Sequence, residues 1–436
     1  MRPAGPFALI DGNNFYVSCE RAFRPGLEGR AVIVLSNNDG CAIARSNEAK
    51  ALGIKMGHPW FQVRQAWPDA SITALSANFA LYGDMSNRLM GIAAGLGPDQ
   101  EVYSIDETFI GLAGIPGDLV RRSRAVRERI LQWTGLPTCV GIGQTKTLAK
   151  LANHIAKAAE RKPGSYPAEM AQVCDLGRLP ASDMDALMAA TEVGEVWGIG
   201  PRIADQLRVL GVRTVLDAAR LDPATVRRRW SVVLERTIRE LQGQPCIGLE
   251  QQPPAKQQIA CTRSFGQPVT ELTPMVQAVS EFAARAGEKL RVQGGRAGQV
   301  LVFAHTSPFR PGKSYSKAIT LSLRRPSSNT LDLVATAARG MRAIFKPGYH
   351  FMKAGVMLLD LVPEGQEQGE LPLDDEGEAA GRLMTAVDAI NDRYGQGSIR
   401  VASAGAQVKK RMFEMRQQLR TPRYTTRWDE LPVARV

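Results

Sequence analysis

Two adjacent acids interrupt an apolar, strand-prone run in the first half of the chain. Asp106 and Glu107 lie within 102–110, among residue types that favour β-structure. A third acid, Asp11, follows the apolar run at 7–10. Carboxylates held among apolar residues must be paired or bind a metal, and oxygen ligands suit Mg²⁺. The pattern predicts a hard-cation site, although Asp106 and Glu107 could equally be turn residues of an exposed hairpin.

Composition limits the class of protein. The chain has 436 residues, 44% of them hydrophobic, which suggests two to four domains at about 100–200 residues each. Its net charge of +12 favours a polyanionic partner over a merely solvated surface. The spacing of its cysteines and histidines indicates neither a disulfide frame nor a zinc site. There is no signal peptide and no apolar run near the roughly 20 residues of a membrane span, so we expect a soluble intracellular protein.

The elements that must position the acids follow one another in a simple order. Strands are expected at 7–10, 101–105, 108–112 and 138–142, and helices at 79–96, 118–134 and 146–159. With a long insertion after the first strand, this βαββαβ order predicts a ferredoxin-like arrangement, in which Asp11 could meet the other acids. Adjacent strand residues point to opposite faces. Asp106 and Glu107 can therefore share a metal only if the strand bends or ends there, or if Glu107 reaches around.

A glycine hairpin lies in the middle of the chain. Gly198 and Gly200 precede a helix whose first turn contains Arg202. Such a turn presents backbone N–H groups to an anion and can hold a nucleic-acid phosphate without contacting bases. A packed helix–turn–helix corner explains the pattern about as well, and the surrounding arginines favour DNA.

A second α+β module is expected after a Pro- and Gln-rich linker. Its basic segments include Arg263, Lys313 and Arg324, which we interpret as a grip on a phosphate backbone, with a solvated surface as the alternative. The acidic, Pro/Gly-rich stretch 363–381 is expected to be flexible. The last segment alternates bases with aromatic residues, which suits single-stranded nucleic acid or a protein partner.

Several motifs resemble those of the Y-family, or translesion, DNA polymerases, and most closely their UmuC branch, the catalytic subunits of bacterial DNA polymerase V. The motifs lie at 11–20, 103–107, 141–150, 41–45, 55–61, 262–266 and 421–427. The resemblance implies an α+β multidomain, right-hand polymerase. It implies a ferredoxin-like palm at 1–168 with fingers inserted at about 16–77, a helix–hairpin–helix thumb at 169–243, a linker at 244–256, a little finger at 257–362, and a flexible segment with a basic tail at 363–436.

The resemblance implies error-prone, DNA-directed DNA synthesis past damaged bases in the SOS response, by nucleotidyl transfer with two Mg²⁺ ions. Asp11 and Asp106 would bind both metals, and Glu107 would help to hold the metal at the primer end. The Gly12 carbonyl would complete the shell of the nucleotide metal. Asn13 stands where many relatives have a second Asp, a harmless change if only backbone is needed there.

Other residues are implied to bind the incoming nucleotide. Tyr16 matches the steric gate, whose ring would clash with a ribose 2′-hydroxyl, although core packing alone could explain a tyrosine there. Lys150 matches the triphosphate-binding lysine. Lys50 and Asn47 stand where other branches carry Arg and Tyr, so the charge is kept at Lys50 while a guanidinium fork is lost, and Arg45 could contribute instead.

The implied partners are primed template DNA and deoxynucleoside triphosphates, a UmuD′-type dimer, the RecA filament and the sliding clamp, in the cytoplasm at the nucleoid. Gln368, Leu371 and Leu373 resemble a clamp-binding motif that lacks the terminal aromatic of stronger versions. One alternative is a catalytically silent DNA-binding accessory of a translesion complex, against which the presence of all the acids argues. A palm-fold cyclase or similar phosphoryl transferase would explain the acids but not the hairpin, the second module or the charge.

Overall fold

The described chain divides into two compact units. The computed structural model describes residues 5–68, 70–309, 312–365, 377–405 and 415–432. One unit comprises Met1–Ser36, Gly40–Pro253 and Leu419–Val436, and the other comprises Asn37–Asp39 and Pro254–Gln418. The division gives each unit its own hydrophobic core. No helix among the described residues has the length and apolar character needed to cross a bilayer.

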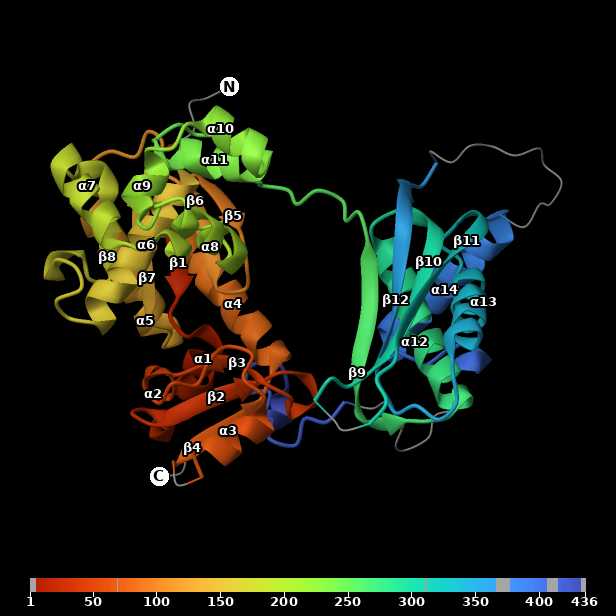
Figure 1. Cartoon of the computed structure of the whole chain (residues 1–436). Coiled ribbons are helices and arrows are strands. Elements are labelled where there is room, and N and C mark those ends of the chain that lie inside the picture. The colour runs from red at the N-terminus through yellow and green to blue at the C-terminus, as the bar shows by residue number, and fades with distance from the viewer. Residues whose placement is uncertain (1–4, 69, 310–311, 366–376, 406–414, 433–436) are drawn as a thin grey trace. The chain divides into compact units, whose positions relative to one another are not determined.

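The first unit is built on a sheet with the strand order β5-β6-β1-β7-β8 (Figure 1). Its strands are β1 (Phe7–Gly12), β5 (Asp99–Val102), β6 (Glu107–Gly111), β7 (Thr138–Gly143) and β8 (Val173–Asp175). β1 pairs antiparallel with both β6 and β7, which places Asp11 opposite Glu107 on one side and Cys139 on the other. The order of the first four strands is the ferredoxin-like order predicted from the sequence. One boundary differs, because the strand expected at 101–105 ends at Val102.

Helices cover both faces of this sheet, which is why β1 is apolar from Phe7 to Ile10. Ala8 and Ile10 belong to a core shared with α4 (Phe79–Ala93) and α5 (Leu119–Thr134), while Phe7 and Leu9 pack with Ala149 of α6 (Lys146–Arg161). Helix α6 lies so close that a Cβ at Gly143 would come within 2.6 Å of the Ala149 backbone nitrogen. Glycine at this position therefore lets α6 approach the sheet.

The insertion after β1 forms its own small sheet, in the order β3-β2-β4. Helix α1 (Phe15–Phe23) leads into it. The remaining elements are β2 (Ala31–Leu35), β3 (Ala42–Arg45), α2 (Asn47–Ala51), α3 (Trp60–Ala66) and β4 (Ile72–Ser76). Helix α2 begins directly after Ser46, whose side chain caps it by accepting a hydrogen bond from the Ala49 backbone N–H.

Short helices complete the first unit. They are α7 (Ala181–Ala190), α8 (Pro201–Val209), α9 (Val215–Ala219), α10 (Pro223–Arg229) and α11 (Val232–Leu241), and they share a core with the far side of α6. The stretch predicted as a linker is in part fixed to this unit. The buried Glu101 carboxylate lies 2.6 Å from Lys146 Nζ and accepts a hydrogen bond from the Glu250 backbone N–H.

The second unit is an antiparallel sheet in the order β11-β10-β12-β9 with α12 (Leu272–Val292) and α13 (Thr330–Ile344) packed on it. Its strands are β9 (Ile259–Val269), β10 (Gly295–Thr306), β11 (Ser316–Ser327) and β12 (Phe351–Pro363). Two elements were not expected from the sequence, namely β9 and α14 (Gly377–Tyr394). The Arg291 guanidinium anchors α14 by two hydrogen bonds of 2.7 and 2.8 Å to the Asp388 carboxylate.

Candidate active site

The three predicted acids gather where β1 ends and β6 begins. Asp11 and Glu107 are cross-strand neighbours, and Asp106 lies in the bend before β6. The Gly12 backbone N–H donates to the Asp106 carbonyl oxygen at 2.8 Å. The Ser104 hydroxyl donates to Asp106 Oδ1 at 2.6 Å. Because Asp106 stands outside the strand, the rule that neighbours point to opposite faces does not separate it from Glu107.

Two lysines of α6 face these carboxylates. Burial raises the pKa of Asp11 to about 7, against the opposing pull of the Lys157 ammonium, whose Nζ lies 2.5 Å from Asp11 Oδ2. Desolvation also acts to raise the pKa of Glu107, but the ammonium of Lys150, 2.8 Å from Glu107 Oε2, helps to bring it below its ordinary value. The buried carboxylates of Asp11 and Glu107 therefore need a positive charge nearby in order to be ionised. Lys157 and Lys150 supply that charge in this structure.

The donor set fits a hard cation in its chemistry. Carboxylates and backbone carbonyls are the oxygen ligands that Mg²⁺ uses. Within the described ranges, however, no three acidic, histidine or cysteine side chains are already grouped as a metal site. In this arrangement Asp11 and Glu107 are paired with lysines and Asp106 with the Ser104 hydroxyl, so the three acids do not form a finished ligand set.

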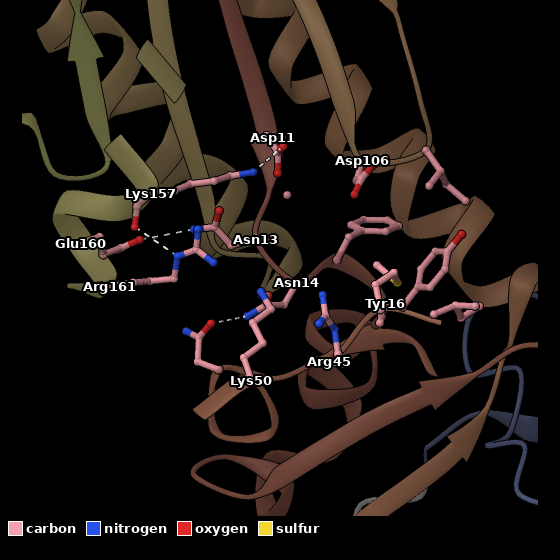
Figure 2. Close-up of a pocket in the computed structure, with 17 residues that line it drawn as sticks. Asp11, Asn13, Asn14, Tyr16, Arg45, Lys50, Asp106, Lys157, Glu160 and Arg161 are labelled. Atoms are coloured by element: carbon pink, nitrogen blue, oxygen red, sulfur yellow. Dashed lines mark hydrogen bonds and ion pairs between the residues drawn. The ribbon is translucent and has the colours of Figure 1, made fainter. Parts of the chain in front are cut away.

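A cavity of about 370 Å³ opens beside the acids. Figure 2 shows the carboxylates of Asp11 and Asp106 at one end and the side chains of Arg45 and Lys50 at the other. Basic residues come to it from separate elements, β3, α2 and α6. The charged residues that line it are Asp11, Asp106, Glu160, Arg45, Lys50, Lys157 and Arg161.

The basic residues in the cavity are close enough to affect one another. Burial, and then the charges of Arg161, Arg45 and Lys157, lower the pKa of Lys50 to about 8. Lys50 Nζ donates to Asn14 Oδ1 at 2.5 Å. Mutual repulsion of this kind is relieved by an anion, so this end of the cavity favours a multiply charged anion such as a triphosphate.

The two lysines of α6 that pair with the acids, Lys150 and Lys157, differ in their position relative to the cavity. Lys150, predicted to bind the triphosphate, does not line the cavity, and its Nζ lies 4.6 Å from the ring centroid of Tyr103 and beside Glu107. Lys157 and Arg161 do line it, and sequence reasoning missed both. Their spacing was an available signal, because positions 150, 157 and 161 fall on nearly the same face of a helix.

Tyr16 also lines the cavity (Figure 2). Its ring stacks on Tyr82, with centroids 4.4 Å apart and planes at 16°, and it meets Phe79 edge-on. The ring is therefore both part of the cavity wall and part of an aromatic stack. This position is compatible with the predicted gate and with the packing role.

The residues predicted to contact DNA are dispersed. Gly198, with φ of +89°, Gly200 and Arg202 are exposed at the start of α8, where no side chain caps the helix. In the second unit, Lys313 and Arg324 are exposed, whereas Arg263 lies 3.8 Å from Glu281. None of these residues lines the cavity. The proposed clamp contacts Gln368, Leu371 and Leu373 lie outside the described residues.

Solved structures identify the class of fold. A Y-family DNA polymerase chimera of Dbh and Dpo4 aligns with a TM-score of 0.64 at 17% sequence identity, over 83% of this chain and 100% of that chain. An insertion ternary complex of Dbh DNA polymerase aligns with a TM-score of 0.51 over the same shares. The chain therefore has the fold of the Y-family DNA polymerases, as its motifs predict.

Sequence comparison identifies the family. Profiles of the impB/mucB/samB family and of its C-terminal domain match residues 10–154 and 256–371. Protein ImpB of Salmonella typhimurium is 43% identical over 99% of this chain and 100% of its own length. Protein UmuC of Salmonella typhimurium strain LT2 is 42% identical over 98% and 99%. DNA polymerase IV of Moorella thermoacetica is 28% identical over 89% and 93%. The chain belongs to the impB/mucB/samB family.

A third match falls at the C-terminal end. Residues 381–434 match a domain of unknown function, DUF4113. The prediction for residues 363–436 is a flexible segment followed by a basic tail that binds a partner or DNA. The match includes most of α14 and the segment that returns to the first unit.

Proposed function

We propose that the chain is an active, error-prone DNA-directed DNA polymerase that copies damaged templates in the SOS response. The observation that carries the proposal is the cavity in which Asp11 and Asp106 stand at one end and the side chains of Arg45 and Lys50 at the other. A metal-bound nucleoside triphosphate has the complementary distribution of charge. Family membership adds that related chains carry the names UmuC and DNA polymerase IV.

Asp11, Asp106 and Glu107, with the Gly12 carbonyl, are the residues that would hold two Mg²⁺ ions. Bound metal at such a site activates the primer 3′-oxygen and offsets the charge of the leaving pyrophosphate. The protein's own part is to keep these oxygens at the junction of β1 and β6 and to neutralise them with lysines until substrate arrives. If a metal ion took the place of Lys157 beside Asp11, Lys157 would be free to bind the triphosphate.

Triphosphate binding is assigned to Arg45, Lys50, Lys157 and Arg161, which share the cavity. Lys150 is assigned to Glu107, which it holds at 2.8 Å. Tyr16 is assigned to sugar selection, because its ring borders the cavity and stacks on the ring of Tyr82.

Tyr16→Ala is expected to raise ribonucleotide incorporation by about 10-fold or more, since loss of the ring removes a steric clash of at least about 1.4 kcal/mol with a 2′-hydroxyl. The measurement compares kcat/KM for a ribonucleotide and its deoxy counterpart. Tyr16→Phe keeps the ring and serves as the control. Unchanged selectivity in Tyr16→Ala would leave only the packing role for this residue.

Lys50 is expected to set an alkaline limit on nucleotide capture. Its pKa near 8 in the free protein means that its positive charge, and the attraction for phosphate, is lost as pH rises through that value. The profile of kcat/KM against pH reports groups of the free enzyme. It should fall above pH 8 in the natural chain, and Lys50→Arg, which stays charged, should move the fall to higher pH. An identical profile in the variant would assign the limit to another group.

The remaining assignments rest on family likeness and, for the residues predicted to contact DNA other than Arg263, on exposure. We propose that six residues contact the DNA backbone: Gly198, Gly200, Arg202, Arg263, Lys313 and Arg324. The proposed domains are those predicted from the sequence, namely a palm at 1–168 with fingers at about 16–77, a thumb at 169–243, a linker at 244–256, a little finger at 257–362 and a C-terminal segment at 363–436. We also propose a cytoplasmic, nucleoid-associated protein that works with a UmuD′-type dimer, the RecA filament and the sliding clamp.

Primer extension tests the function. Primed DNA, undamaged or with an abasic site, is incubated with the full chain, Mg²⁺ and deoxynucleotides, with and without the UmuD′-type dimer, RecA filament and ATP. Extension through the abasic site is the expected result. Failure to extend any primer in every mixture, with DNA binding preserved, would favour a silent accessory of a translesion complex.

A further inference from the structure

The end of the chain returns to the first unit and is built into it (Figure 1, blue). We call residues 419–430 the C-terminal strap. Its first residue exchanges two hydrogen bonds with Ser76 at the end of β4, of 3.0 and 3.1 Å. The Asn78 amide donates to the Thr421 carbonyl, the Thr421 hydroxyl and the Pro422 carbonyl at 3.0 to 3.2 Å. The strap is thus a specific part of this unit.

One side chain of the strap reaches a buried carboxylate. Glu20, on α1, is 0% exposed. Its Oε1 accepts hydrogen bonds from the Tyr82 hydroxyl at 2.7 Å and from the Thr421 hydroxyl at 3.1 Å. Its other oxygen, Oε2, is buried and has no hydrogen-bond partner among the described residues. The position of this carboxylate therefore depends on its two known donors, of which the strap supplies one.

The second donor to Glu20, Tyr82, contacts a residue that lines the cavity. The ring of Tyr82 stacks on the ring of Tyr16, which lines the cavity. Contacts thus run from Thr421 through Glu20 and Tyr82 to Tyr16. A carboxylate shielded from water depends strongly on each donor. Loss of the Thr421 hydroxyl should let Glu20 shift towards Tyr82, and the stack transmits the shift because its rings are in van der Waals contact.

We propose that Thr421 is a positioning residue for nucleotide-sugar selection, acting through Glu20 and Tyr82 on the ring of Tyr16. The inference rests on the gate role proposed above for Tyr16. It gives the C-terminal domain of unknown function a definite task, since Thr421 lies within its match at residues 381–434. A steric gate works through short-range repulsion, so a small displacement of its ring alters discrimination while leaving synthesis from deoxynucleotides in place.

The test measures kcat/KM for a ribonucleotide and its deoxy counterpart with the full chain on primed DNA. Thr421→Val keeps the side-chain shape and removes the hydroxyl. It should reduce sugar selectivity by about 3- to 10-fold, the range that one hydrogen bond provides, mainly through faster use of the ribonucleotide. Thr421→Ser, which restores the donor, should restore selectivity. Arg427→Ala is the matched control within the strap, because Arg427 pairs with Asp429 and makes no described contact with Glu20.

Tyr82→Phe provides an independent variant in case the strap change impairs folding. It removes the other donor to Glu20 and keeps the stacked ring, so it should also loosen selectivity. Its combination with Thr421→Val should be non-additive, because both act through one carboxylate. Equal losses for both kinds of nucleotide, or unchanged selectivity in both variants, would make the strap purely structural and overturn the inference.

Failure of the inference is distinguishable from failure of the proposed function. If Tyr16→Ala changes sugar selectivity and the Thr421 and Tyr82 variants do not, only the positioning role is lost. If the natural chain extends no primer, or if Tyr16→Ala leaves selectivity unchanged, the gate itself is wrong and the positioning role is overturned with it.

Discussion

Asp106→Ala is expected to abolish nucleotide addition, with kcat lowered by about 1,000-fold or more, because several kcal/mol of metal-dependent charge stabilisation disappear. Asp106 stands in the bend before β6 and outside the strand ladder. Its backbone carbonyl, which the substitution keeps, accepts the hydrogen bond from the Gly12 N–H. The sheet should therefore keep its structure in this variant, and the substitution should affect only the chemical step of nucleotide addition.

DNA binding should persist in Asp106→Ala, since affinity for the phosphate backbone depends on basic residues elsewhere. Primer extension and a salt-matched DNA-binding assay separate the two properties. Asp84→Ala is the matched control, because Asp84 is a carboxylate on α4 that pairs with Arg88 and does not line the cavity. Continued synthesis by Asp106→Ala would remove this residue from the metal site.

Lys157→Ala is expected to lower kcat/KM for a deoxynucleotide by about 10- to 150-fold, which corresponds to the roughly 1.5–3 kcal/mol of a hydrogen bond to a charged group. Most of the effect should appear in KM, because Lys157 lines the cavity and is one of the residues assigned to the triphosphate. Single-turnover kinetics over a range of nucleotide concentrations separate binding from chemistry.

Lys150→Ala should give a different signature. Lys150 holds Glu107 outside the cavity, so its loss should lower kcat more than it raises KM. Lys162→Ala, at the exposed residue that follows the C-terminal end of α6, controls for the loss of a lysine charge from this part of the chain. A larger KM effect for Lys150→Ala than for Lys157→Ala would return triphosphate binding to Lys150, as the family motif implied.

Sequence alone predicted four of the five strands of the central sheet, all but β8, and the position of the acids. Strands with apolar residues on both faces, helices with regular apolar spacing and caps such as Ser46 are specified within a few residues of one another. The order of these elements fixed the ferredoxin-like plan, and with it the meeting of Asp11 with Glu107. Strand β9 was not predicted. Few of its residues are fully buried, and its sequence shows only a weak alternation of apolar and polar residues.

Tertiary structure decided which charges share the cavity and what the end of the chain does. Arg45 and Lys50 come from the insertion and Lys157 from α6, and no local pattern relates them. Thr421 and Glu20 meet across a sequence separation of 401 residues. Contacts of this kind depend on the packing of whole elements against one another, whose free energy is the sum of many weak terms. Hydrophobic periodicity and helix caps depend only on residues that are close in the sequence, so they cannot predict a contact between residues that are far apart in it.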